Sequence, residues 1–374
     1  MSDTALTVLD LVPISSGSTA RDAIANSVDL ARAAEQAGYR RYWFAEHHLN
    51  PGVAGTSPAV LLALTASATS SIRLGTAAVQ MGHRTALSTV EEFGLLDAVH
   101  PGRFDLGLGR SGGKPVGREL VTTAPRRLVD GRTDNGLLIP ESFDWSQLLG
   151  SPRIGLTQRL LQLPNATPQD YVDQVADVLA LLAGTFVDER GQEAHIVPGE
   201  GADLQLWILG SSAGESAQVA GDRGLRFGAN YHVSPGTVLE AVDAYRAAFV
   251  PSDDLDVPYV SVSADVVVAD THDAAVELAR GYAPWVHSIR SLAGAIEYPT
   301  PDQARGLAWD DASAALVADR VATQFVGTAR EVADDLERLR DATSADELII
   351  TTITHDHADR VRSYRLLADE WAHR

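Results

Sequence analysis

The stretch Tyr39–His48 (YRRYWFAEHH) joins an apolar run to three side chains that can share or exchange protons. Residues Tyr42–Ala45 are aromatic and apolar, which is typical of a buried strand. The run ends at Glu46, His47 and His48, and loop-forming residues follow. In parallel α/β folds, ligands and chemistry lie at the carboxyl edge of the sheet. We therefore expect these groups to face a site.

Paired histidines also suggest a metal centre, but their spacing argues against one here. His47 and His48 are adjacent on an extended segment, so their side chains are expected to point to opposite sides and not to share an ion. In His355-Asp356-His357, Asp356 is expected to be a helix N-cap. We predict no metal site.

Two further segments carry groups suited to an anion. Gly210–Ser216 combines small residues, hydroxyls and a following helix, which together favour a phosphate cradle. The alternative is an ordinary turn with a helix cap. Arg110 follows a neighbouring strand and could pair with phosphate oxygens, although a surface ion pair is the commoner role of an arginine. Gly107-x-Gly-x-x-Gly112 matches the dinucleotide fingerprint only formally, because no helix is expected to open directly after it.

The candidate site residues are expected to be positioned by a fold in which strands and helices alternate. The chain predicts eight strands separated by helices, which favours a single (β/α)8 TIM barrel of the α/β class over 1–374; an open doubly wound sheet is the alternative. Two stretches interrupt the rhythm, 111–168 after strand four and 271–321 after strand seven, and are expected to be insertions over the C-terminal mouth. The predicted strands are Leu6–Pro13, Tyr39–His48, Ile72–Met81, Phe104–Gly109, Leu204–Leu209, Leu225–Asn230, Tyr259–Val268 and Glu347–Ile353.

Composition narrows the class of protein. The formal charge of −20 argues against nucleic-acid and anionic membrane partners. The absence of cysteine excludes disulfides and thiolate chemistry. We see no signal peptide and no apolar run long enough for a membrane span, so a cytoplasmic location is expected.

Taken together, the motifs resemble the bacterial luciferase-like monooxygenase family of flavin-dependent barrel enzymes. The resemblance spans nearly the whole chain apart from the two insertions. It is carried by AEHH at 45–48, LGTAAVQ at 74–80, GRFDLGLGRSGG at 102–113, WILGSSAGESAQVAGDRGLRF at 207–227, FVGTAREVADDLERL at 325–339 and DHADRVRSYRLLAD at 356–369.

This resemblance implies a flavin-binding site and the residues that form it. Reduced FMN, or coenzyme F420 in some branches of the family, binds at the barrel mouth, with its phosphate held by an arginine that matches Arg110 and by groups around Ser211 and Ser212. A cis non-prolyl peptide under the isoalloxazine falls on Ala77-Ala78, and His47 matches the catalytic histidine. A second phosphate arginine cannot be placed. Its candidates are Arg118, Arg126 and Arg127.

The implied activity is a two-component monooxygenase. Reduced FMN from a separate flavin reductase reacts with O2 to give a C4a-hydroperoxide, which oxygenates a small organic substrate, while the protein supplies orientation and excludes solvent. His47 would exchange a proton near neutral pH. A homodimer is expected from the family alone.

Three rival functions stay open at this point. An F420-dependent oxidoreductase would use the same barrel, and so would a non-catalytic flavin-binding protein. A glycosidase would need two carboxylates at the mouth, but of Glu46 and Asp105 the latter lies near the start of its strand.

Overall fold

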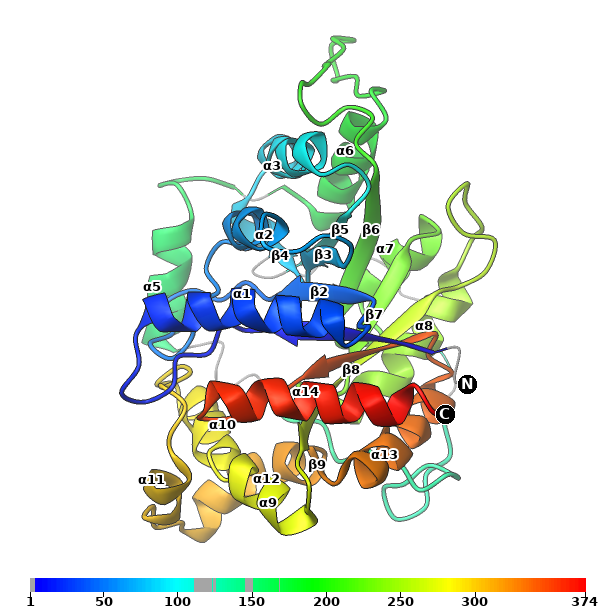
Figure 1. The fold of residues 1–374 in the computed structure, drawn as a ribbon. Coiled ribbons are helices and arrows are strands. Elements are labelled where there is room, and N and C mark those ends of the chain that lie inside the picture. The colour runs from blue at the N-terminus through cyan, green and yellow to red at the C-terminus, as the bar shows by residue number, and fades with distance from the viewer. Residues whose placement is uncertain (1–3, 111–122, 124–125, 145–150, 168) are drawn as a thin grey trace.

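The structure is a computed structural model and describes residues 4–110, 123, 126–144, 151–167 and 169–374 (Figure 1). The strands are β1 (Ala5–Asp10), β2 (Arg41–Phe44), β3 (Arg73–Thr76), β4 (Val79–Gln80), β5 (Phe104–Gly109), β6 (Leu204–Gly210), β7 (Arg226–Asn230), β8 (Val260–Val268), β9 (Phe325–Gly327) and β10 (Glu347–Thr351).

Parallel pairing closes these strands into a barrel. The order runs β1-β2-β3-β5-β6-β7-β8-β10, and β10 pairs with both β8 and β1, so the ring of eight strands has no open edge. Val8, for example, lies opposite Ile350 on one side and Tyr42 on the other. The predicted TIM barrel is therefore confirmed, and the open-sheet alternative is wrong.

Helices cover the outside of the barrel (Figure 1). Thr328 and Glu331 form a capping box at the start of α13, and Thr19 with Asp22 forms another at the start of α1. Helices α1 and α14 lie side by side where the ring closes. The helices are α1 (Ala20–Gln36), α2 (Pro58–Ala66), α3 (Ala86–Val99), α5 (Pro152–Leu161), α6 (Tyr171–Leu182), α7 (Glu215–Asp222), α8 (Val238–Ala248), α9 (His272–Ala279), α10 (Tyr282–Arg290), α11 (Pro301–Arg305), α12 (Asp311–Ala322), α13 (Ala329–Thr343) and α14 (His357–Trp371).

The two irregular stretches differ in structure. In 111–168 the described parts hold short bridged turns and helix α5. The stretch 271–321 consists of four helices, α9 to α12, after which β9 pairs in parallel with the end of β8. Strand β9 was not predicted, because three residues carry too little alternation to be recognised in a sequence.

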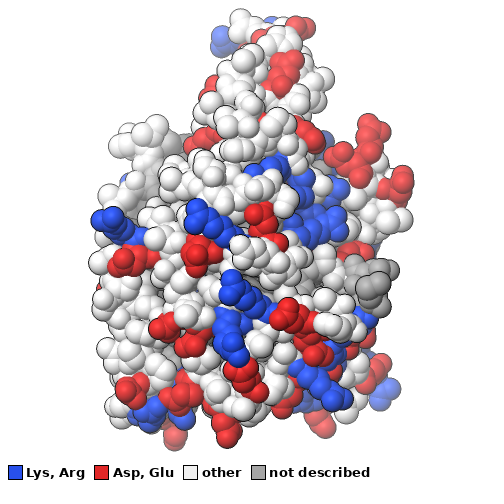
Figure 2. Space-filling model, in the orientation of Figure 1, with Lys and Arg blue, Asp and Glu red and all other residues white. Residues whose placement is uncertain are grey.

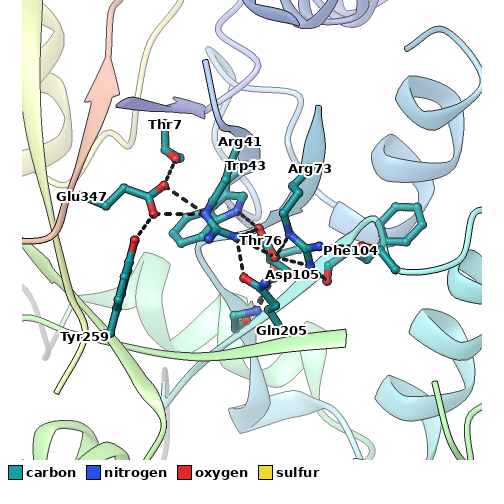
Figure 3. A network of polar contacts seen from close by, with 12 residues as sticks. Thr7, Arg41, Trp43, Arg73, Thr76, Phe104, Asp105, Gln205, Tyr259 and Glu347 are labelled. Carbon is teal, nitrogen blue, oxygen red and sulfur yellow. Dashed lines mark hydrogen bonds and ion pairs between the residues drawn. The ribbon is translucent and has the colours of Figure 1, made fainter. Parts of the chain in front are cut away.

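A buried network of charged groups fills the lower part of the barrel, at the N-terminal ends of the strands (Figure 3). Arg41 lies between Asp105 and Glu347, at 2.9 Å and 3.0 Å, and all three are at most 1% exposed. Asp105 also accepts hydrogen bonds from Trp43 and Arg73. Because Asp105 is committed to these partners below the mouth, the glycosidase alternative fails.

The molecular surface is mixed in charge. On the face shown in Figure 2, acidic side chains are interleaved with basic ones and do not leave a single basic field. Among the described residues, none of the helices has the length and apolar character that crossing a membrane would take.

Candidate active site

A cavity of about 410 Å³ opens at the C-terminal mouth of the barrel. Strand ends supply one side of it, and segments from both irregular stretches supply the other. Apolar side chains make up the larger part of its wall and several polar groups are set among them, which is typical of a small-molecule site. It is lined by Leu9, Leu11, Ala45, His47, Asn50, Val53, Ala77, Arg153, Asn230, His232, Val233, Asp265, Trp285, Ile289, Ala295 and Arg320.

His47 faces this cavity directly after β2. Its backbone N–H donates to the Gly55 carbonyl at 2.7 Å, and its Nδ1 is buried without a hydrogen-bond partner among the described residues. Burial is the main reason that the pKa of His47 is lowered to about 4; His48 adds to the shift and Glu46 opposes it. The imidazole is therefore neutral at pH 7, with a proton on one ring nitrogen and an acceptor site on the other, and its pKa lies below the near-neutral range that the sequence predicted.

Glu46 joins the segment after β2 to β4 and the segment that follows it. Its Oε1 lies 2.8 Å from His48 Nε2 and 3.0 Å from His83 Nε2, and its Oε2 accepts from the Gln80 backbone N–H at 3.0 Å. Burial disfavours the ionised Glu46, but hydrogen bonds from His83 and His48 and the charge of Arg84 outweigh it and lower its pKa to about 2. His48 thus points away from His47, as the alternation predicted.

The Glu46, His48 and His83 side chains have the composition of a metal site. However, the Arg84 guanidinium lies 3.5 Å from the same Glu46 oxygen and already supplies a positive charge there. The three side chains are also satisfied by one another. We therefore interpret the cluster as a structural clamp between β2 and the segment after β4.

The peptide between Ala77 and Ala78 is cis, as the resemblance predicted. Ala77 lines the cavity, on the strand that neighbours the one ending in His47. Its side chain is small, so this part of the wall is flat. A planar ring could lie against it.

A second, more polar cavity of about 300 Å³ adjoins the first. It contains Arg110, Ser211 and Ser212, which the sequence assigned to a phosphate, and the N-terminal end of α7. Asn230 lines both cavities, so the two are neighbours. Arg110 lies 3.6 Å from Glu215 in the same cavity, and its side chain is 38% exposed and therefore accessible to a ligand.

Of the three candidates for a second phosphate arginine, the two that the structure describes, Arg126 and Arg127, do not reach this cavity. Arg118 lies outside the described residues. Arg126 forms an ion pair with Asp243 of α8 and donates to the Ala342 carbonyl at the end of α13. Arg127 is exposed and lines neither cavity. A helix following a barrel strand ends at the lower rim, so Arg126 lies far from the mouth.

Sequence reasoning assigned no role to four polar groups of the larger cavity, which are Arg153, His232, Asp265 and Arg320. His232 Nδ1 lies 2.6 Å from Ser263 Oγ, and burial together with Arg320 and His47 lowers the pKa of His232 to about 3. Asp265 binds Arg320 at 3.1 Å, and burial raises the pKa of Asp265 despite that contact. His232 follows a predicted strand, which was a usable signal. Arg320 comes from an irregular stretch and gave none.

A wider groove of about 530 Å³ lies outside the barrel among α9 to α12. Its two arginines, Arg280 and Arg305, are both paired with Glu277, so its charges are compensated. The groove is remote from the strand ends that carry His47. The mouth is therefore the better candidate for chemistry.

The lowered pKa values of the two cavity histidines predict a dependence of stability on pH. An unfolded histidine titrates near pH 6.5, so between about pH 4 and 6.5 the unfolded chain binds more protons than the folded one and the free energy of unfolding rises with pH. Each histidine adds at most about 1.4 kcal/mol per pH unit. Urea unfolding at pH 5 and 7.5 should therefore show a smaller pH effect in His232→Gln than in wild type. Exposed His373→Gln serves as the control, and an unchanged pH effect in His232→Gln would refute the assignment.

Comparison with known proteins agrees with this geometry. The family described as luciferase-like monooxygenase matches residues 5–128 and 166–346. The uncharacterized protein YvbT of Bacillus subtilis (strain 168) is 34% identical over 100% of this chain and 98% of its own length. A luciferase-like monooxygenase of Escherichia coli (strain K12) is 32% identical over 98% of this chain and 96% of its own length.

Solved structures share the fold. Apo-MsnO8 superposes with a TM-score of 0.77 at 27% identity, covering 99% of this chain and 98% of its own. Two more distant structures with this fold are an FMN complex of the oxygenating constituent of 3,6-diketocamphane monooxygenase and an F420-dependent secondary alcohol dehydrogenase, with TM-scores of 0.65 and 0.60 and coverage of 98% of each chain in both cases. Their identities of 17% and 14% show the fold alone.

Proposed function

This chain belongs to the luciferase-like monooxygenase family, and from that premise we propose that it is a flavin-dependent monooxygenase that uses reduced FMN and O2 to oxygenate a small organic substrate. The alternative cofactor is F420, because solved structures of this fold bind one or the other. We further propose that a separate reductase supplies the reduced flavin, and that the protein acts in the cytoplasm as a homodimer.

The observation that carries the proposal is the pair of adjoining cavities. The larger is walled by apolar side chains and has the small Ala77 beside His47; the smaller is polar and holds Arg110 with hydroxyls and a helix N-terminus. A flavin mononucleotide has the same division, with an apolar ring system at one end and a phosphate at the other. The contiguity at Asn230 supports one ligand spanning both.

The chain's own residues have distinct roles in this proposal. Arg110, Ser211 and Ser212 hold the phosphate, the first by charge and the others by donating hydrogen bonds. Reduced flavin, when bound, supplies the electrons that activate O2. His47, neutral at pH 7, accepts a proton at an imidazole nitrogen beside the ring.

The apolar wall of the mouth cavity would exclude water. Leu9, Val53 and Trp285 come from three different segments and surround the mouth cavity. A reactive oxygen species bound there would meet few water molecules, which limits its unproductive breakdown. We propose that the segments 111–168 and 271–321 complete this enclosure.

A titration distinguishes the two cofactors. Purified protein is mixed separately with FMN and F420, and binding is followed by flavin fluorescence. Oxygen uptake is then measured with photoreduced FMN under air and corrected for the spontaneous oxidation of the same FMN without protein. Tight binding of FMN with oxygen consumption supports the proposal; selective binding of F420 and hydride transfer without oxygen uptake would replace it with the alternative. Tight FMN binding without substrate-dependent oxygen uptake would favour a non-catalytic flavin-binding protein.

Arg110→Ala is expected to weaken binding of FMN by roughly tenfold or more, because a charge-assisted hydrogen bond contributes about 1.5–3 kcal/mol. Binding of riboflavin, which lacks the phosphate, should stay unchanged. Fluorescence titration of both ligands measures the difference. The matched control is Arg223→Ala, an exposed arginine at the opposite end of α7. Equal affinities for FMN in wild type and Arg110→Ala would remove the phosphate assignment.

A further inference from the structure

Arg153 is a guanidinium on the wall of the mouth cavity that lacks an acidic partner. It lies near the start of α5 and donates from Nη2 to the Leu49 carbonyl at 2.6 Å and to Asn50 Oδ1 at 2.7 Å. Both acceptors are neutral. Among the described residues, no carboxylate lies within ion-pair distance of Arg153. In a chain with 50 acidic and 30 basic residues, an uncompensated arginine at a cavity requires an explanation.

The surroundings hold Arg153 in place. Asn50 Oδ1 also accepts from the Ala295 backbone N–H at 3.0 Å, so one amide oxygen ties together the loop after β2, the segment after α10 and helix α5. Leu49, whose carbonyl receives the second bond, has a φ of 53°, which is uncommon for a non-glycine residue. The guanidinium is therefore positioned before any ligand arrives.

The other arginine of the cavity, in contrast, is paired with a carboxylate. Arg320 donates from Nε to Tyr282 Oη at 3.0 Å and from Nη2 to Asp265 at 3.1 Å, so a carboxylate already compensates its charge. The two histidines of the cavity are neutral at pH 7. The net charge of the cavity lining is thus +1, and it resides on Arg153.

We propose that the substrate is an organic carboxylate with an apolar body, whose carboxylate pairs with Arg153 while the body lies against Val53, Trp285 and Ile289. Both hydrogens of Nη2 are already donated to Leu49 and Asn50, so the carboxylate would be held by the charge of the guanidinium and by a hydrogen bond from Nη1 or Nε, and the positive end of α5 adds to the attraction. These apolar residues and His47 line the same cavity as Arg153, so the apolar body would lie in the space that His47 faces. This inference rests on the proposed function, because it assigns the substrate of that same site.

The test compares probes that differ only in charge. The FMN-loaded protein is titrated with 4-phenylbutanoate and with 4-phenylbutanamide, and binding is followed by ligand-observed NMR. Wild type should bind the carboxylate about tenfold more tightly than the amide. In Arg153→Gln this preference should fall below about threefold, with FMN affinity unchanged as evidence that the site is intact. Arg159→Gln, on the exposed side of the same helix, should keep the full preference.

Two outcomes would overturn the inference. One is that wild type does not prefer the carboxylate, either because it binds the amide equally well or because it does not bind the carboxylate. The other is a preference that survives in Arg153→Gln. Because protein alone forms the cavity, the same titrations are repeated without FMN. Failure of FMN to bind would count against the proposed function. The carboxylate preference of the FMN-free protein tests the role of Arg153 independently of that result.

Discussion

Substitution of His47 by alanine is expected to lower turnover with reduced FMN and substrate by about 10²–10⁴-fold, the usual contribution of a positioned acid–base group. His47 lines the mouth cavity beside Ala77, and its Nδ1 has no hydrogen-bond partner among the described residues. Flavin affinity should change little, because the phosphate contacts assigned to Arg110 and the serines lie in the other cavity. Single-turnover product yield and FMN titration measure the two effects separately.

His47→Gln gives a sharper form of the same experiment. Glutamine keeps a hydrogen-bonding group near the same place but has no nitrogen that accepts a proton, so it should be as inactive as alanine. His100→Asn is the control, because His100 caps the end of α3 at the opposite end of the barrel and packs on Phe104. Retention of most wild-type turnover in His47→Gln would show that proton transfer by this residue is not required.

Strand ends were the part of the site that the sequence could predict. Apolar runs such as Tyr42–Ala45 and Leu204–Leu209 identify buried parallel strands, and a closed parallel barrel brings all their carboxyl ends to one mouth. For this reason His47, Ala77 and Ser211 could be brought together without coordinates. The roles of His47 and Ala77 toward a cofactor came from the family resemblance and not from this pattern.

Side chains delivered from outside the strand–helix rhythm could not be predicted in this way. Arg153 reaches the cavity from α5 and Arg320 from α12, and both helices belong to irregular stretches whose paths are set by tertiary packing. A local pattern gives the start of α5, where Ser151 caps the helix, but not what that helix packs against. Three of the four proposed substrate contacts, Arg153, Trp285 and Ile289, lie on α5 and α10 in these stretches, so the family resemblance indicated a class of reaction but not a substrate.

The buried charged residues at the N-terminal end of the barrel could not be recognised from the sequence for a different reason. Arg41, Asp105 and Glu347 all lie at or next to the first residue of a strand, where a polar residue usually marks the solvated end. In the structure each points inward and is fully enclosed (Figure 3). Their charges compensate one another, and Tyr259 and Thr7 donate hydrogen bonds to Glu347. Only the three-dimensional pairing shows that these charges belong to the core.

That pairing makes the network sensitive to removal of a single member. Asp105→Ala is expected to lower the free energy of unfolding by about 3–5 kcal/mol, because it leaves Arg41 buried with one of its two carboxylates missing and also frees Arg73. Asp270→Ala breaks the exposed ion pair with Arg362 and should cost less than about 1 kcal/mol. Urea unfolding of both variants at pH 7 gives the comparison. If the two losses were equal, the buried charges would contribute no more than surface ones, and the barrel would depend on its apolar layers alone.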